Sequence, residues 1–331
     1  MSKARIALVG AGTMGANHAR VVSQSSRATL ELVVDVDGAR AAGMASRYGA
    51  RSSEHLEDAL TCDAVILATP TQFHLPAALT IIEAGLPLLV EKPVSLDLED
   101  VEQVCAAART GGVALVCGFV ERFNPVINLA KQLLDEPPIH LVAMRHSPRD
   151  PRNVGSVIHD LLIHDLDLAL LLFGADEVAR VSGSSWPTGD GSAEIADCTV
   201  QFASGALATL SASRVGQRKL RSIQVLTPSL LLDLDLLRAD VTVYRNVRQE
   251  QPDETVALTY RAETIIDIPF VRHTGEPLAL ELDHFLDLCE GSGDGKLEID
   301  RIIASHVLAR QVETQCTTRP TSDRSLSEEE R

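Results

Sequence analysis

Three ionisable residues on one apolar segment have types and spacing suited to acid–base chemistry. The segment 156–173 is predicted to be one long helix, on which Asp160, His164 and Asp167 fall within roughly 60° of one another. Leucines cover most of the remaining circumference and leave no broad solvated face. Ionisable groups on such a helix are costly unless they are paired or face a cavity, where burial can tune a histidine.

Three interpretations of this stripe stay open. The groups could catalyse a reaction, or they could satisfy one another as a polar cluster at a domain interface, and the helix alone does not separate these two. A metal site is the third, with Asp160 and His164 as ligands four residues apart and His140 or His146 as a further ligand. Because the sequence offers no unambiguous third ligand, we expect no metal.

A lysine follows a predicted buried strand in the first part of the chain. Glu91-Lys92-Pro93 stands at the C-terminal end of the strand 87–90, and ligands of open α/β sheets bind beyond the carboxyl ends of the strands. Lys92 is therefore predicted to reach the nicotinamide end of a cofactor, where an ammonium can stabilise developing negative charge on oxygen. The alternative is a lysine paired only with Glu91 or a nearby aspartate.

A glycine-rich turn near the start of the chain predicts a dinucleotide site. Gly10, Gly12 and Gly15 follow the apolar run 6–9 and open a helix-like stretch, and Asp35 ends the next strand. Gly10 permits a tight turn, Gly12 admits a pyrophosphate, and Gly15 lets the helix pack on the strand, while the helix N-terminus favours phosphate.

The identity of the dinucleotide depends on Asp35. This residue follows Gly15 by about 20 positions, where an acid accepts hydrogen bonds from the adenosine ribose. A carboxylate there repels the 2′-phosphate of NADP, so we expect NAD. NADP stays open because Arg40 is close enough in sequence to screen a phosphate.

These residues need a fold that brings them together. Up to residue 122, short apolar runs alternate with helical segments, which is typical of a doubly wound parallel α/β domain. Strand-like alternations separated by turns such as Ala203-Ser204-Gly205 then predict an open, mostly antiparallel sheet. We expect a Rossmann domain at 1–122, an α+β substrate-binding and oligomerisation domain at 123–316, and a disordered polar tail at 317–331. The predicted strands beyond the first two are 63–68, 87–90, 112–118, 139–145, 178–184, 194–202, 206–213, 220–226, 230–236, 240–245 and 255–260, and the predicted helices are 76–84, 98–110, 126–134, 156–173, 277–289 and 299–315.

Composition favours a cytoplasmic enzyme. The 331 residues are 45% hydrophobic, enough to bury a large core. A formal charge of −16 disfavours nucleic acid and anionic membranes as partners. No apolar run reaches the length of a membrane span, and no signal peptide precedes the first strand. The six cysteines form no C-x-x-C pair, so we expect reduced thiols.

Five motifs together resemble one enzyme family. The segments GAGTMGANH (10–18), ATPTQFH (68–74), EKP (91–93), GFVERFNP (118–125) and HDLLIHDLD (159–167) are similar in order and spacing to the glucose-fructose oxidoreductase, inositol dehydrogenase and MocA family, written Gfo/Idh/MocA. Glu276-Pro277-Leu278 resembles a further part of its pattern. The likeness spans nearly the whole chain. It implies an NAD(P)-dependent dehydrogenase that moves a hydride between a secondary hydroxyl of a sugar, cyclic polyol or nucleotide sugar and the nicotinamide.

The resemblance also implies roles for single residues. Lys92, Asp160 and His164 become the catalytic set: His164 takes the hydroxyl proton, Asp160 orients or relays, and Lys92 positions the oxygen. Asp167 on the same stripe would contact substrate. The implied cofactor-binding set is Gly10, Gly12, Thr13, Met14, Gly15, Asp35, Thr69, Pro70, Thr71, His74, Glu91 and Lys92.

Some of these assignments keep an alternative. His74 either borders the cofactor or is an ordinary histidine at a helix start. Arg122 and Asn124 lie near the domain junction, where a structural role is at least as good an explanation as ligand contact.

An arginine-rich segment before the catalytic helix bears on the substrate. Arg145, Arg149 and Arg152 lie in a stretch similar to that of family members acting on UDP-N-acetylglucosamine-type substrates. Arginines bind a diphosphate through bidentate hydrogen bonds, so Arg149 and Arg152 are assigned to substrate. A solvated or salt-bridged loop explains the segment equally well.

Two rival functions and an assembly complete the expectations. The family includes a repressor that binds dinucleotide without turnover, so a dinucleotide-sensing regulator is one alternative, and a keto-sugar or imine reductase is another. The leucines at 230–232, 234, 236 and 237 place apolar residues on more than one face of the second sheet. Such a surface predicts a homodimer or homotetramer through that sheet.

Overall fold

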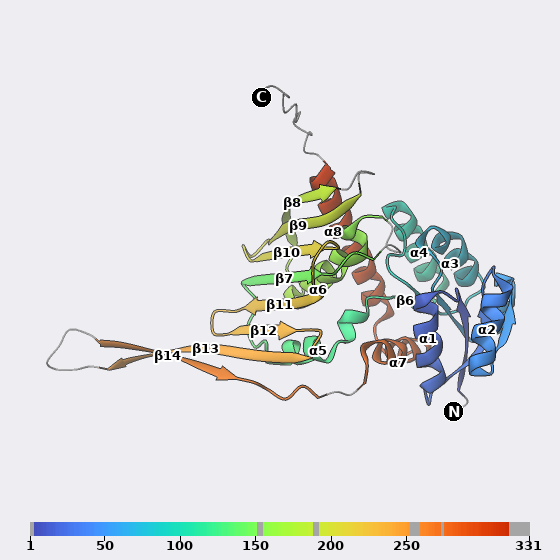
Figure 1. Ribbon diagram of the computed structural model, residues 1–331, viewed down its shortest axis with the longest axis horizontal. Helices are drawn as coiled ribbons and strands as arrows, with labels where there is room; N and C mark the ends of the chain where they lie inside the picture. Colours follow the sequence, from blue (N-terminus) through green and yellow to red (C-terminus); the bar gives the residue numbers. More distant parts are fainter. Residues whose placement is uncertain (1–2, 151–154, 188–191, 252–258, 273–274, 318–331) are drawn as a thin grey trace, which may run out of the picture.

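The first part of the chain forms a parallel sheet with helices on both faces, which confirms the doubly wound α/β prediction (Figure 1). The structure is a computed structural model that describes residues 3–150, 155–187, 192–251, 259–272 and 275–317. The strands of this first sheet are β1 (Ala4–Val9), β2 (Ala28–Val34), β3 (Arg51–Ser53), β4 (Ala64–Leu67), β5 (Leu88–Val90) and β6 (Leu115–Cys117). Their order is β3-β2-β1-β4-β5-β6 and every pair is parallel. The order reverses between β1 and β4, where doubly wound folds bind ligands.

Some helices around this sheet begin at a side-chain cap and end at a glycine with positive φ. The Asp97 side chain accepts a hydrogen bond from the backbone N–H of Glu99 at the start of α4 (Leu98–Gly111), and Gly112 ends that helix at φ 62°. Helix α2 and strand β3 were not predicted from the sequence; α2 buries only the small residues Ala41 and Ala45. The other elements of this part are α1 (Thr13–Gln24), α2 (Gly38–Tyr48), η1 (Leu56–Thr61), η2 (Thr71–Phe73), α3 (His74–Glu83), η3 (Val120–Phe123) and α5 (Pro125–Leu133).

A second, mostly antiparallel sheet follows, as the sequence predicts (Figure 1). Its strands are β7 (His140–His146), β8 (Val178–Pro187), β9 (Ala193–Phe202), β10 (Leu207–Ser213), β11 (Leu220–Leu226), β12 (Leu231–Asp235), β13 (Asp240–Gln251) and β14 (Thr259–Asp267). Their order is β14-β13-β12-β11-β7-β10-β9-β8, and within the described strands only β7 and β10 pair in parallel.

The edge of the second sheet differs from the sequence prediction. The strand expected at 240–245 continues to Gln251 and pairs with β14 as a hairpin that extends beyond the rest of the sheet (Figure 1). The strand expected at 255–260 is misplaced, because β14 begins at Thr259, and 252–258 lie outside the described residues.

The helix expected over 156–173 begins with a different geometry. Ile158–Leu162 form a π-helical turn, η4, and only Ile163–Phe173 are α-helical, as α6. A π turn closes over more residues than an α turn, so angles counted at α-helical spacing do not carry across it. The single stripe expected from Asp160 to Asp167 does not form, and these two carboxylates contact different partners.

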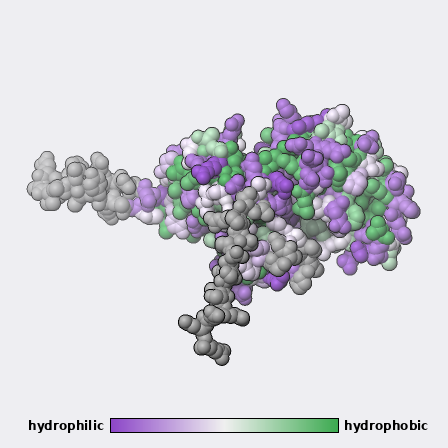
Figure 2. Space-filling model, turned by 90° about the horizontal axis from the view of Figure 1, so that it is seen from above, coloured by the Kyte–Doolittle hydropathy of each residue, from purple (hydrophilic) through white to green (hydrophobic). Residues whose placement is uncertain are grey.

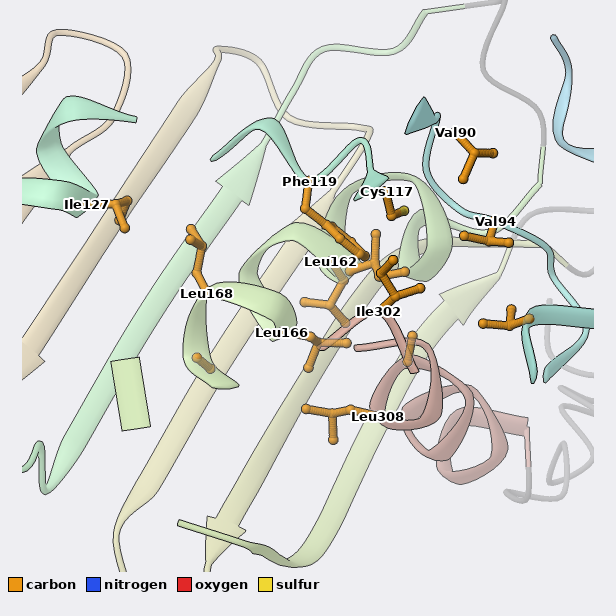
Figure 3. Close-up of a cluster of buried hydrophobic side chains, with 14 of the residues drawn as sticks. Val90, Val94, Cys117, Phe119, Ile127, Leu162, Leu166, Leu168, Ile302 and Leu308 are labelled. Carbon is orange, nitrogen blue, oxygen red and sulfur yellow. The ribbon is translucent and has the colours of Figure 1, made fainter. Parts of the chain in front are cut away.

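The last two helices return to the first sheet. Residues of α7 (Pro277–Cys289) such as Phe285 join the apolar cluster on one face of that sheet and pack near α1. Helix α8 (Gly295–Thr317) contacts α4, β6, α6 and β8, so it touches elements of both sheets. Figure 3 shows Val90 and Cys117 in one buried cluster with Leu162 and Ile302. A continuous apolar core therefore joins the two sheets.

Two further expectations concern the C-terminal tail and membrane-spanning helices. Apart from Thr317, the tail expected at 317–331 lies outside the described residues. In the part of the chain that the structure describes, no helix is both long enough and apolar enough to cross a membrane.

Candidate active site

The three glycines of the first turn meet three different steric demands. A Cβ at Gly10 would lie 2.6 Å from the carbonyl of Ala68, and its φ of 102° is itself unfavourable for other residues. A Cβ at Gly15 would lie 1.9 Å from the carbonyl oxygen of Gly10, so only glycine lets α1 approach the turn this closely. A Cβ at Gly12 would meet nothing within 4 Å, which leaves open space beside the N-terminus of α1. This space is where a pyrophosphate fits.

Asp35 is fixed at the end of β2 beside this turn. Its Oδ2 accepts a hydrogen bond from the backbone N–H of Ala11 at 2.8 Å, and its Oδ1 accepts one from Asp37 at 2.9 Å. Arg40 Nη1 lies 3.6 Å from Asp35 Oδ2 and its Nη2 lies 3.2 Å from Asp37. The carboxylate that the sequence assigns to the ribose is thus held by backbone groups, with one arginine already against it.

The remaining residues of the expected cofactor set divide into surface and interior. Met14 is 38% exposed and Thr13 is exposed at the first turn of α1, and Pro70 and Thr71 line a cavity beyond the first sheet. The Thr69 hydroxyl oxygen is buried without a hydrogen-bond partner. These residues are placed where a bound dinucleotide could touch them.

His74 and Glu91 are interior residues, and their contact with the cofactor stays a prediction. The His74 ring is buried between the backbone oxygens of Thr69 at 2.8 Å and Pro93 at 3.0 Å, so it holds two turns together. Glu91 is buried and lies 2.7 Å from His18 Nε2. Burial raises the pKa of Glu91, but the hydrogen bond and charge of His18 and the charge of Lys92 bring that pKa below its usual value.

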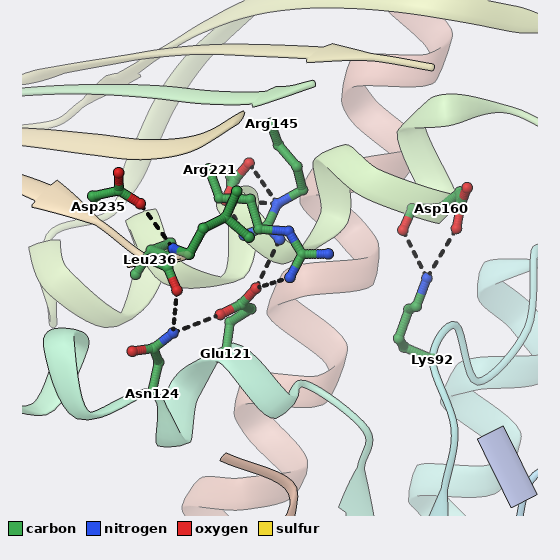
Figure 4. Close-up of polar contacts among 10 residues, drawn as sticks. Lys92, Glu121, Asn124, Arg145, Asp160, Arg221, Asp235 and Leu236 are labelled. Carbon is green, nitrogen blue, oxygen red and sulfur yellow. Dashed lines mark hydrogen bonds and ion pairs between the residues drawn. The ribbon is translucent and has the colours of Figure 1, made fainter. Parts of the chain in front are cut away.

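Lys92 and Asp160 meet across the junction of the two sheets. Lys92 Nζ donates to the backbone oxygen of Asp160 at 2.7 Å and to its Oδ1 at 3.3 Å, as Figure 4 shows. Both side chains line a cavity of about 570 Å³ together with Pro70 and Thr71. The structure therefore brings an ammonium from the loop after β5 against a carboxylate from η4, in the same cavity as the expected cofactor loop.

His164 lies near this pair with a neutral ring. Burial holds the pKa of His164 well below its ordinary value, and the charges of Lys92, Arg145 and Arg221 act in the same direction. Its Nδ1 is buried without a hydrogen-bond partner, and Phe119 packs against its ring edge to face. A lowered pKa keeps the imidazole in the unprotonated form that a general base requires.

Asp167 does not reach this cavity. Arg122 donates to it from Nε at 2.8 Å and from Nη2 at 2.6 Å, and Ser305 donates at 2.6 Å. Arg122 also pairs with Glu298 at 2.5 Å. Asp167 is 3% exposed with its oxygens occupied by protein groups, so it forms a buried ion pair, and its contact with substrate stays a prediction.

The arginine-rich segment is only partly available to a ligand. Arg145 is buried and hydrogen-bonds to Asp165 and Glu121, so it belongs to the core (Figure 4). The side chain of Arg149 is 68% exposed, and its Nη2 lies 3.9 Å from Glu194. Arg152 lies outside the described residues.

Several residues of the site carried no usable signal in the sequence. His159 lines the cavity beside Asp160 and lies 3.3 Å from Glu313. Arg214 lies 3.7 Å from Asp160 and 3.2 Å from Glu194. His18 is part of a quoted motif, but nothing in the sequence pairs it with Glu91. Among the described residues, no group of three or more His, Cys, Asp and Glu side chains is arranged to hold a metal ion.

Two family models match most of the described fold. Residues 4–119 match the model described as "Oxidoreductase family, NAD-binding Rossmann fold", and residues 137–227 match the model of the GFO/IDH/MocA C-terminal domain.

Individual proteins show the same similarity. The chain is 31% identical over 292 residues to UDP-N-acetylglucosamine 3-dehydrogenase of Acidithiobacillus ferrooxidans, which covers 86% of this chain and 88% of that protein. A solved structure of that enzyme, GnnA, has a TM-score of 0.82 at 27% identity and covers 96% of this chain and 98% of the other. Inositol 2-dehydrogenase of Rhizobium meliloti is 32% identical over 226 residues, 63% of this chain and 68% of the relative. A structure of GenD2 from gentamicin A biosynthesis in complex with NAD shares the fold, with a TM-score of 0.80 at 22% identity over 96% of this chain and 95% of that one.

Proposed function

Because the chain belongs to the Gfo/Idh/MocA family of NAD-binding oxidoreductases, we propose that it oxidises a secondary hydroxyl of a nucleotide sugar of the UDP-N-acetylglucosamine class. Its activity as an NAD-dependent dehydrogenase of CH–OH groups follows from the family and from its dehydrogenase relatives. The observation that supports the site is the meeting of Lys92 and Asp160 in a cavity shared with Pro70 and Thr71.

The residues fit a bound dinucleotide at three points. The open space at Gly12 would hold the pyrophosphate, Asp35 would accept from the adenosine ribose, and Pro70 and Thr71 would border the nicotinamide. Bound NAD supplies a ring carbon that accepts a hydride. Arg40 already contacts the Asp35 carboxylate, and NAD is proposed as the preferred form.

The protein's own groups manage the proton and the developing charge. We assign His164 as the base that takes the hydroxyl proton, at Nε2, because its Nδ1 is buried. Lys92 hydrogen-bonds the substrate oxygen and stabilises negative charge on it as the proton leaves. Asp160 orients the Lys92 ammonium. These roles require only neutral His164 and charged Lys92, which is the state that burial and neighbouring charge favour for His164.

The substrate class is supported by charge at one end of the second sheet. Arg218 and Lys219 are exposed and Arg221 is partly exposed where β11 begins, beside the end of β7 that leads to Arg149. Such cations suit a diphosphate, and they gather in a protein of formal charge −16. Arg149 and Arg152 are proposed as further contacts.

The test is NADH formation with a panel of cyclic polyols, free sugars and nucleotide sugars, followed by absorbance. We expect turnover with UDP-N-acetylglucosamine or a close relative of it. Turnover of polyols alone would contradict the substrate class. Tight NAD binding with no turnover of any candidate would favour the dinucleotide-sensing regulator, and activity only from NADH with a keto-sugar or imine would favour the reductase.

A homodimer or homotetramer through the second sheet is part of the same proposal. Leu207, His140 and Leu226 form a row across three neighbouring strands, and Met144 lies on the same face. Leu237 is also exposed, whereas Leu232 and Leu234 are buried. Seen from above in Figure 2, hydrophobic and hydrophilic residues are interspersed over the molecule. Light scattering should give a multiple of the chain mass, and a monomeric mass would contradict this assembly.

Two broader statements belong to the proposal. A division into domains at 1–122 and 123–316 is supported by the change from parallel to mostly antiparallel sheet. A cytoplasmic location without nucleic-acid partners is supported by six free cysteines and the acidic composition. Fractionation of the source cells, with reducing and non-reducing gels of the protein, tests the location.

A further inference from the structure

A buried arginine outside the family motifs lies behind the proposed catalytic pair. Arg214 follows β10, and its side chain is 2% exposed. Its Nη1 lies 3.7 Å from Asp160 Oδ2, and its Nε lies 3.2 Å from Glu194 Oε2. Its Nη2 donates to the backbone oxygen of Gly155 and, at 3.4 Å, to that of Ala193. The Arg214 guanidinium thus contacts the start of β9, the backbone at Gly155 and the Asp160 carboxylate that pairs with Lys92.

The charges in this row alternate. Lys92, Asp160, Arg214 and Glu194 follow one another as cation, anion, cation and anion, each with an oppositely charged neighbour within 3.7 Å. Alternation of this kind lets charges remain ionised in a poorly hydrated place. Removal of Arg214 would leave Asp160 paired with Lys92 alone, and Glu194 with Arg149 at 3.9 Å.

The row is incompletely hydrogen-bonded at one point. Asp160 Oδ2, Arg214 Nη1 and Arg214 Nε are buried, and none has a hydrogen-bond partner within the described structure. A separation of 3.7 Å is beyond hydrogen-bond range, so Arg214 and Asp160 attract each other electrostatically without a hydrogen bond. Catalytic contacts are often long in a ligand-free enzyme and shorten when substrate binds.

Arg214 acts through another residue. It is absent from the lining of the cavity that Lys92 and Asp160 share, although Gly155, whose carbonyl it holds, does line that cavity. A group in this place sets the position of the Asp160 carboxylate and of the loop beside it.

We propose that Arg214, anchored by Glu194, is a positioning residue that aims the Asp160 carboxylate at Lys92 and thereby fixes the ammonium for hydride transfer. The expected loss of kcat rests on the proposed function. The expected displacement of the Asp160 carboxylate rests on geometry alone.

The kinetic test uses a double-mutant cycle with UDP-N-acetylglucosamine and NAD. Arg214→Met should lower kcat by about 100-fold, the size expected when a reacting group is displaced by about 1 Å. The KM for NAD should stay near that of the wild type, because Arg214 is remote from the glycine turn. Arg214→Lys, which keeps the charge, should restore most of the loss. In an Asp160→Asn background, Arg214→Met should cost little more.

A matched control separates positioning from general damage. Arg27→Met removes an arginine that pairs with Asp287 at 2.8 Å on the far side of the first sheet, and kcat should not change. Calorimetric NAD binding checks that each variant is folded. If Arg214→Met does not fold, Arg214→Lys and Glu194→Gln carry the same comparison, with a smaller loss of kcat expected from each. Effects of Arg214→Met and Asp160→Asn that simply add would overturn the proposal.

A crystallographic arm keeps the inference separate from the choice of substrate. In Arg214→Met, or in Glu194→Gln if the former does not fold, the Asp160 carboxylate should leave hydrogen-bond range of Lys92 Nζ. An unchanged Lys92–Asp160 contact would overturn the inference whatever the enzyme turns over. If the wild type turns over no member of the panel while Asp160 still moves in the variant, the proposed function fails and the positioning role stands.

Discussion

The segment from η4 to α6 carries two ionic clusters that are paired to different degrees. At its start, Asp160 lies 3.3 Å from Lys92 and 3.7 Å from Arg214, and no described residue hydrogen-bonds to its Oδ2. Farther along, Asp167 accepts two hydrogen bonds from Arg122 and one from Ser305, all between 2.6 and 2.8 Å. Both clusters border a cavity, but in the second both ion-pair partners, Asp167 and Arg122, are almost fully buried.

The difference in hydrogen bonding between the two clusters distinguishes a binding site from a structural ion pair. A carboxylate whose acceptors are all occupied has nothing left for a ligand, and its partners cannot leave without stranding a buried charge. A carboxylate with one unused oxygen and a movable lysine can exchange contacts as a substrate arrives. The arrangement favours catalysis at Asp160 and stability at Asp167.

Removal of Lys92, the cation that pairs with Asp160, or of His164, the nearby base, should have the largest effect on activity. Lys92→Met should lower kcat/KM by about 10²–10³-fold, and His164→Ala by about 10²–10⁴-fold. NAD affinity measured by calorimetry should stay near normal in both variants. Lys296→Met, at an exposed position, is the control. Rates near those of the wild type in either variant would reject the catalytic assignment.

Disruption of the cluster of Arg122 and Asp167 should lower stability instead of activity. Arg122→Met strands Asp167 and Glu298, so the free energy of unfolding should fall by about 3–5 kcal/mol, with kcat per folded molecule little changed. Arg109→Met breaks the exposed pair with Asp300 and should cost at most about 1 kcal/mol. Urea unfolding and active-site titration provide the two readouts. A large loss of kcat with unchanged stability would erase the distinction between the clusters.

Asp35 extends the comparison to a carboxylate held by backbone groups. Asp35→Ala should weaken NAD by about 10- to 100-fold, since charged hydrogen bonds to the ribose would be lost, and should narrow the preference over NADP. Asp35→Asn keeps the shape and should lose less. Fluorescence titration with NADH and NADPH measures both. An unchanged cofactor preference would mean that another residue recognises the ribose.

Glu281 extends the comparison to a carboxyl group with no hydrogen-bond partner among the described residues on either oxygen. Burial raises the pKa of Glu281 well above its usual value, and the Glu91 charge adds to this. The folded protein keeps a proton that the unfolded chain releases above about pH 4.3, so this contribution to stability is full in acid and is lost as pH rises. Glu281→Gln should therefore raise the thermal midpoint by about 2 °C or more near pH 8, and by little near pH 4. Glu57→Gln, at an exposed site, should show no such pH dependence.

The sequence predicted what depends on local pattern. The apolar runs of the buried strands, the spacing from Gly10 to Asp35 and the lysine after β5 all depend on neighbours in the chain, and each has its structural counterpart. The cofactor domain and the mixture of sheets could therefore be predicted.

The partners of the charged residues could not be predicted, because they come from distant segments. The ion pair of Asp167 could not be predicted, since a π turn changes the phase before it and Arg122 lies 45 residues away. Glu91 lies in a motif but pairs with His18, 73 residues earlier. Arg214 meets Asp160 because the end of β10 packs near η4, 54 residues away in the chain.

The return of α7 to the first sheet constrains how the protein can be made. Ribosomes add roughly 5–20 residues per second, so the sheet that ends at Cys117 waits many seconds before Phe285 leaves the exit tunnel and completes its apolar cover. During that interval a newly made NAD-binding region presents unprotected hydrophobic surface to chaperones. A shortened gene that stops after the first sheet should accordingly yield an aggregating fragment rather than a minimal cofactor-binding unit.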